Sequence, residues 1–260
     1  MAGSGQHIIE LRTGKKAFFL SDQHFGAPDR ESSRLREKKF LNFLEEIREQ
    51  AQVIFLLGDL FDFWFEYRNV VPKGYVRILG KLAELQDAGV EIHFFIGNHD
   101  LWMNTYFQEE LQIPTYRRPQ NFLINGKEFL IGHGDGLGPG DKGYKRLKKL
   151  FTNPLANWLY RALHPDVGVW LGTYMSRRNQ MMAGDVEDDY LGEEKEWLVQ
   201  YCHHKQSQKA YDYFVFGHRH LPLEIPINDA MYINTGDWVK HFTYAEFDGL
   251  EMLLKKYHQS

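Results

Sequence analysis

The sequence predicts an α/β sandwich in which two sheets face each other and helices cover the outside. Apolar segments of strand length alternate with segments of helical periodicity through the first half of the chain, a pattern typical of α/β folds. Several of these strands end in Asp, Asn or His. From residue 231 onward, strand-like segments follow one another with only short turns between them. That last run indicates a second sheet, mixed or antiparallel.

The length and composition favour one folded globular domain. A chain of 260 residues can bury a substantial core, and two small domains would also fit, but we expect one domain over residues 1–260. The net charge of -4 does not suggest a nucleic-acid binder. The single cysteine, Cys202, excludes an internal disulfide framework. Because no apolar run reaches membrane-spanning length and residues 1–6 lack a signal-peptide core, we expect a cytoplasmic protein with at most peripheral membrane contact.

The first predicted strand covers residues 16–22 and ends in Ser21-Asp22-Gln23-His24. Side chains two residues apart in an extended segment point to the same side, so Asp22 and His24 can act together. A carboxylate beside an imidazole suits a transition metal. Residues 25–35 are polar and form a loop, and apolar residues at helical spacing follow from about residue 36.

The second strand, residues 53–57, is entirely apolar and too short for a helix, which indicates burial on both faces. It stops at Gly58 and presents Asp59, which can serve two metal ions, one per carboxylate oxygen. An isolated Gly-Asp pair is more often the start of a turn. The ligand interpretation is favoured because four other strands also end in Asp, Asn or His. Residues 61–67 are crowded with aromatics, which form core or wall a pocket.

Three further strands end in the same way. A helix over residues 75–88 closes at Gly89, and the strand at residues 90–96 then ends in Gly97-Asn98-His99-Asp100. Asn125-Gly126 predicts a hairpin over residues 122–131. The second strand of the hairpin ends in Gly132-His133, and a strand at residues 213–216 ends in Gly217-His218-Arg219-His220. The late strands are predicted at residues 231–234, 241–247 and 251–254.

Taken together, the five strand-end motifs resemble the calcineurin-like metallophosphoesterase superfamily over about residues 18–220. The resemblance implies a four-layer αββα sandwich and two divalent metal ions. It places one ion on Asp22, His24, Asp59 and His220, and the other on Asp59, Asn98, His133 and His218. It also implies that His99 stabilises charge or protonates the leaving group, with Asp100 orienting it. Carboxylate, imidazole and amide ligands suit manganese best here, with iron or zinc as alternatives.

An insertion at residues 137–200 separates the last two motifs and predicts a helical lid. Residues 137–182 contain eight Lys or Arg and two Asp, a net charge of +6, together with many aromatic and aliphatic residues. Pro154 and Pro165 stand where short helices could begin. Such a lid could grip a phosphorylated substrate or touch an anionic membrane. It could also be a helical hairpin that packs on the sheet with solvated lysines.

Two motifs in this chain are longer than the metal ligands require: Gly58-Asp59-Leu60-Phe61-Asp62-Phe63-Trp64, and His133-Gly134-Asp135-Gly136-Leu137 with Asp141 and Tyr144 downstream. Together with the basic helical lid, they resemble the UDP-2,3-diacylglucosamine diphosphatases of the lipid A pathway. The resemblance implies that a dimetal-activated water attacks the α-phosphorus of a lipid-linked nucleotide sugar at the cytoplasmic membrane surface. It places substrate contacts at Asp141, Tyr144, Arg177 and Arg178. One departure is His99, where these enzymes usually carry Arg. The alternatives are hydrolysis of a soluble phosphoester and, in another class, a non-catalytic binding scaffold.

Overall fold

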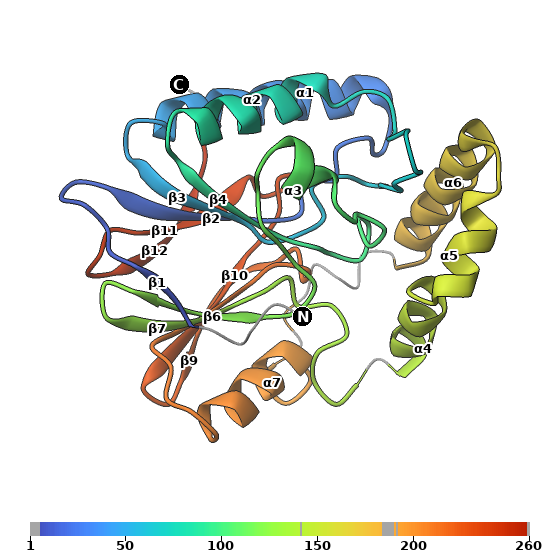
Figure 1. Cartoon of the computed structure of the whole chain (residues 1–260). Coiled ribbons are helices and arrows are strands. Elements are labelled where there is room, and N and C mark those ends of the chain that lie inside the picture. Colours follow the sequence, from blue (N-terminus) through green and yellow to red (C-terminus); the bar gives the residue numbers. More distant parts are fainter. Residues whose placement is uncertain (1–5, 141, 184–189, 191, 259–260) are drawn as a thin grey trace.

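The structure is a computed structural model that describes residues 6–140, 142–183, 190 and 192–258. Within these residues the strands form two sheets that face each other, and helices cover their outer surfaces (Figure 1). The predicted four-layer αββα sandwich is confirmed.

The β3 sheet holds the first three predicted strands side by side. Its strand order is β12-β11-β2-β3-β4-β5, spanning Met252–Lys256, Thr243–Phe247, Lys16–Leu20, Ala51–Leu56, Glu91–Phe95 and Thr115–Tyr116. Strands β2, β3, β4 and β5 run parallel, and β11 joins β2 antiparallel. Neighbouring parallel strands end at one edge of the sheet, so the residues that follow β2, β3 and β4 meet there.

The β7 sheet is mixed, but it is not built from the late run of strands as predicted. Residues 231–234 belong to it, whereas β11 and β12 join the β3 sheet, because β11 pairs with β2. The strand order of the β7 sheet is β1-β6-β7-β8-β10-β9, spanning His7–Ile9, Gln120–Ile124, Lys127–Ile131, Tyr213–Phe216, Ala230–Thr235 and Pro222–Ile227. Strands β7 and β8 are parallel, so their ends also lie together. The predicted hairpin joins β6 to β7, with Asn125 and Gly126 both at positive φ, as a two-residue turn of this type requires.

Three apolar layers hold the sandwich together. Helices α1 (Arg30–Ile47) and α2 (Val76–Asp87) cover the β3 sheet, with α3 (Tyr106–Glu110) beside them (Figure 1). Between the sheets, Phe19 stacks on Phe55 of its own sheet at 4.9 Å and on Phe129 of the other at 6.0 Å, centroid to centroid. Helix α7 (Trp197–Gln206) packs on the outer face of the β7 sheet.

The lid helices are α4 (Lys142–Phe151), α5 (Pro154–Arg161) and α6 (Pro165–Ala183), and they lie beside the sandwich (Figure 1). Pro154 and Pro165 begin α5 and α6, as predicted. Residues 197–200, the end of the predicted insertion, form the first turn of α7, where Leu198 and Val199 are buried against the β7 sheet. The structure describes no helix long and apolar enough to cross a membrane.

Candidate metal centre

Seven side chains predicted as metal ligands come together between the ends of the two sheets. Asp22 and His24 follow β2, Asp59 follows β3 and Asn98 follows β4, while His133 follows β7 and both His218 and His220 follow β8. Asp22, His24, Asp59 and His133 are almost fully buried. Residues nearly 200 positions apart in the chain therefore share one small, enclosed volume.

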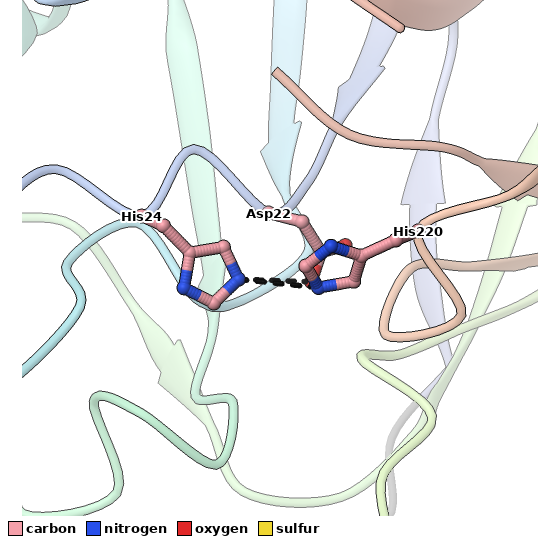
Figure 2. A group of neighbouring side chains, drawn as sticks. All are labelled: Asp22, His24 and His220. Carbon is pink, nitrogen blue, oxygen red and sulfur yellow. Dashed lines mark hydrogen bonds and ion pairs between the residues drawn. The ribbon is translucent and has the colours of Figure 1, made fainter. Parts of the chain in front are cut away.

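On one side, Asp22, His24 and His220 face one another (Figure 2). Nε2 of His24 lies 3.2 Å from Nε2 of His220, and Nε2 of His220 lies 3.2 Å from Oδ1 of Asp22. Oδ1 of Asp22 is buried and accepts no hydrogen bond from the described residues, whereas Oδ2 accepts one from the backbone N–H of His218. A carboxylate oxygen facing two imidazole nitrogens in this way is a suitable position for a cation.

On the other side, His133 lies against Asp59 and Asn98. Nε2 of His133 is 3.4 Å from Oδ2 of Asp59 and 3.1 Å from Oδ1 of Asn98. The same Asp59 oxygen is 3.7 Å from Nε2 of His24. The His218 ring completes this side, 5.1 Å from the His133 ring between centroids.

Asp59 therefore differs in one detail from the expected arrangement. We expected one carboxylate oxygen per ion, but Oδ1 accepts a hydrogen bond of 2.8 Å from the backbone N–H of His99. Oδ2 alone faces both histidines. Oδ2 is therefore the Asp59 oxygen that would be available to cations on both sides.

The other ring nitrogens of three of these histidines face outer carbonyl or carboxylate groups, which leaves Nε2 pointing inward. Nδ1 of His133 is 2.7 Å from the carbonyl oxygen of Leu57, which can only accept, so Nδ1 carries the proton. Nδ1 of His24 lies 3.8 Å from Asp62, and Nδ1 of His220 lies 3.6 Å from Asp237. Backing of this kind by a carboxylate or carbonyl is usual for metal-binding histidines. The donor set and its support thus fit divalent metal ions.

Sequence analysis did not identify Asp237, although a signal for it was present. Strand β10 ends in Thr235, and Gly236-Asp237 follows, repeating the strand–Gly–Asp pattern of the second motif. Oδ1 of Asp237 accepts backbone hydrogen bonds from Val239, Lys240 and His241, so its loop is fixed.

The backbone at the strand ends is held in an unusual conformation. Five of the predicted ligands have positive φ, a region that residues other than glycine rarely adopt: Asp22, His24, Asp59, His218 and His220. Such strain is characteristic of functional sites. The glycines of the motifs allow close approach. A Cβ at Gly217 would lie 2.6 Å from Oδ2 of Asp22, and one at Gly58 would lie 2.5 Å from Nδ1 of His133.

The electrostatics of the metal centre favour a bound cation. Burial opposes ionisation of Asp59 and Asp22, but the surrounding histidines outweigh it, so the pKa of each carboxyl lies below its usual range. Burial likewise opposes charge on His24 and His133, but the carboxylates raise the pKa of His24 to about 9 and that of His133 to about 10. Two carboxylates thus draw protons onto their neighbours, and divalent cations can replace those protons.

His99 and Asp100 have different surroundings from those expected. Nδ1 of His99 lies 2.9 Å from the carbonyl oxygen of Asp62 and 3.0 Å from Oγ of Ser176 in α6. The carboxylate of Asp100 instead accepts backbone hydrogen bonds from Gly97 at 2.6 Å and Leu60 at 3.0 Å. Asp62 and Ser176, rather than Asp100, orient His99, and Asp100 joins the loops that carry Asp59 and Asn98.

The predicted substrate contacts are only partly described. Oη of Tyr144 donates to Oδ2 of Asp135 at 2.5 Å, close to the His133 loop. Asp141 lies outside the described residues. Arg177 and Arg178 belong to α6, whose backbone is described there, but their side chains are not.

A cavity of ≈ 590 Å³ opens beside His133, between α4 and the loops that follow β5 and β7. Its charged lining is mostly basic and consists of Arg117, Arg118, Lys145, Lys148, Lys149 and Asp135. Three of the five basic side chains are engaged. Lys148 pairs with Asp135 at 2.5 Å, the guanidinium of Arg117 donates to the carbonyl oxygen of Leu101 at 2.8 Å, and Nζ of Lys145 donates to the carbonyl oxygen of Gly138 at 2.5 Å. The cavity therefore offers an anionic ligand a positively charged wall next to the metal centre.

Comparison with known proteins agrees with this geometry. The profile of the calcineurin-like phosphoesterases matches residues 16–224. The chain is 38% identical over 253 residues to the UDP-2,3-diacylglucosamine hydrolase of Porphyromonas gingivalis, covering 92% of this chain and 97% of that protein. It is 28% identical to the protein of the same name from Ectopseudomonas mendocina, covering 82% and 87% respectively. Among solved structures, the TT1561 protein of Thermus thermophilus covers 94% of this chain and 99% of its own, with a TM-score of 0.45 and 11% identity.

Proposed function

Because the chain belongs to the calcineurin-like phosphoesterase family, a family of metal-dependent hydrolases, we propose that it cleaves the pyrophosphate of UDP-2,3-diacylglucosamine. The products are UMP and 2,3-diacylglucosamine 1-phosphate. The observation that carries the proposal is the convergence of seven ligand-type side chains from five strand ends in one enclosed cluster. The named relatives then supply the substrate, because 92% of this chain aligns with the Porphyromonas gingivalis hydrolase.

Two divalent cations, manganese by preference, fit this cluster. Asp22, His24, Asp59 and His220 hold one, and Asp59, Asn98, His133 and His218 hold the other. When bound, such ions neutralise phosphate charge and lower the pKa of water to supply a nucleophile. His218 is suited to ligation because burial, with the neighbouring His133, lowers its pKa to about 4 and keeps it neutral.

The chain's own residues bind and orient the substrate around this centre. His99 reaches the leaving phosphate through Nε2, since Nδ1 is committed to Asp62 and Ser176. The basic cavity beside His133 receives the nucleotide diphosphate. Tyr144 lies at its margin, and Asp141, Arg177 and Arg178 complete the proposed substrate contacts.

The lid helices supply an apolar surface for the acyl chains and for the membrane from which the substrate comes. These helices and the link between α5 and α6 carry the largest group of exposed apolar residues among those described: Leu147, Leu150, Leu155, Trp158, Leu159, Leu163, Val167, Trp170, Tyr174 and Met175. Trp158 and Trp170 are each 66% exposed. Exposed apolar surface beside lysines and arginines is typical of proteins that bind anionic membranes. A soluble phosphoester substrate would leave this surface without a role.

The test is hydrolysis of UDP-2,3-diacylglucosamine by the purified chain with Mn²⁺ in ¹⁸O-labelled water, followed by mass spectrometry. We expect UMP that carries one ¹⁸O and unlabelled sugar phosphate, because water attacks the α-phosphorus. An ¹⁸O label in the sugar phosphate would place the attack on the β-phosphorus and contradict the proposed attack on the α-phosphorus. Faster turnover of UDP-sugars without acyl chains would favour the soluble-phosphoester alternative. A purified protein that binds no Mn²⁺ would favour the alternative that the chain is a non-catalytic binding scaffold.

A further inference from the structure

Helix α6 contacts the core through a face of small residues. Gly168, Gly172 and Ser176 are spaced four residues apart and so lie along one side of the helix. A Cβ at Gly172 would overlap the ring of Phe63, and one at Gly168 would overlap Oη of Tyr67. These glycines allow the helix backbone to lie directly on the aromatic segment that follows Asp59.

At the end of this face, Ser176 reaches the metal centre. Its side chain is buried, and its Oγ donates to Oδ1 of Asp62 at 3.0 Å and lies 3.0 Å from Nδ1 of His99. Nδ1 of His99 is also 2.9 Å from the carbonyl oxygen of Asp62, which can only accept. Nδ1 therefore carries a proton, and the Ser176 hydroxyl can accept from His99 while donating to Asp62.

The same Asp62 oxygen connects His99 to a predicted metal ligand. Oδ1 of Asp62 lies 3.7 Å from Nδ1 of His99 and 3.8 Å from Nδ1 of His24. The two rings meet edge to face, with centroids 4.6 Å apart. Asp62, His24 and His99 all belong to loops that follow strands of the β3 sheet. Of the four hydrogen-bonding or ion-pairing residues in this cluster, Ser176 comes from the lid helices.

We propose that Ser176 is a positioning residue through which the seated lid orients His99 for the reaction. The inference rests on the proposed function, because it assigns His99 a role at the leaving phosphate. Because α6 packs on the aromatic segment that follows Asp59, it holds the Ser176 hydroxyl 3.0 Å from Nδ1 of His99. The orientation of His99 thereby depends on the seating of α6.

The test is a double-mutant cycle of Ser176→Ala and His99→Ala, with kcat, KM and bound metal measured on UDP-2,3-diacylglucosamine. We expect Ser176→Ala to lower kcat roughly tenfold, the effect of one lost hydrogen bond, with KM and metal content unchanged. In the His99→Ala background the same change should cost no further activity. Thr173→Ala, a substitution in the same helix outside this face, is the matched control and should behave like wild type.

A readout that does not depend on substrate separates this inference from the proposed function. The ¹⁵N imidazole spectrum should show an Nδ1 proton that disappears in His99→Ala and exchanges faster in Ser176→Ala. If that signal is present but UDP-2,3-diacylglucosamine is not cleaved, the proposed function fails and the positioning contact stands. Two results would overturn the role of Ser176. One is an equal loss of kcat from Ser176→Ala in the wild-type and His99→Ala backgrounds, and the other is an Nδ1 proton signal of His99 that is unchanged in Ser176→Ala.

Discussion

One oxygen of Asp59 faces both halves of the candidate metal centre. Its Oδ2 faces His24 on one side and His133 on the other, while its Oδ1 is held by the backbone N–H of His99. The hydrogen bond on Oδ1 fixes the carboxylate, so Oδ2 cannot rotate away from its position between the histidines. If the proposed ligand set is right, a change at this residue affects both metal ions together.

We predict that Asp59→Asn lowers kcat by more than the ~10–100-fold typical of losing an outer partner of a metal ligand. The bound metal should fall from two ions to fewer than one per chain in elemental analysis, and circular dichroism should show an unchanged fold because the side chains are nearly isosteric. Two tightly bound ions with near-normal turnover would rule out the bridging role.

His99→Ala should give the opposite pattern. Its backbone N–H, which the substitution keeps, is the group that contacts Asp59. Metal content should therefore stay at the wild-type level while kcat falls by about 10²-fold, the lower range for a lost acid–base group. Elemental analysis beside steady-state kinetics checks this, and a loss of metal would make His99 a ligand or a structural support instead.

At the scale of elements, the strand ends were the predictable part of this molecule. Each of the five motifs follows an apolar strand, and the structure places all five at adjoining ends of the two sheets. The hairpin at Asn125-Gly126 and the proline starts of α5 and α6 were equally clear, because each rests on local backbone chemistry.

The elements that sequence analysis missed depend on distant partners. Strand β1 is only three residues long and exists through its pairing with β6. Strand β9 contains Pro226, which is tolerated because β9 lies at a sheet edge. Ser176 gave no signal at all, since a serine within a helix becomes notable only once α6 lies against Asp62 and His99.

The lid helices carry their own prediction. Replacing Trp158 and Trp170 by serine removes two exposed indoles, each worth roughly 1.5–3 kcal/mol when buried. Binding to phosphatidylglycerol vesicles in a flotation assay should weaken at least tenfold, while hydrolysis of a small soluble diester stays unchanged. Leu250→Ser is the matched control, because Leu250 is 83% exposed but lies in the turn between β11 and β12. Equal binding by all three proteins would exclude the lid helices as the membrane contact.

For the whole molecule, the clustered carboxylates and histidines couple metal binding to pH. The folded protein without metal raises the pKa of His24 to about 9 and of His133 to about 10, above the ordinary value of 6.5. Protonation of these rings therefore stabilises the metal-free fold fully below about pH 6.5, and this contribution is lost as pH rises through 9 to 10. Metal ions must displace the same protons to bind.

We accordingly predict that Mn²⁺ binds more tightly as pH increases from 6 to 8, by about tenfold per pH unit for each proton displaced. In a thermal shift assay at fixed Mn²⁺, the gain in Tm over a chelated sample should grow across this range. Asp59→Asn should flatten the dependence. A gain in Tm that is constant with pH would show that the histidines are not ligands.

The order of strands in the β3 sheet also sets when the metal centre can form as the chain is synthesised. Strand β2 lies between β3 and β11, so residues near 18 pair with residues near 246. A growing chain carries Asp22 and Asp59 early, but His218 and His220 follow about 160 residues after Asp59, and β11 later still. Until then one edge of β2 is open and the acidic residues have no histidine partners from β8. We therefore predict that metal loading is a late event in biogenesis, and that a ribosome-bound chain that stops before β11 neither retains Mn²⁺ nor resists proteolysis.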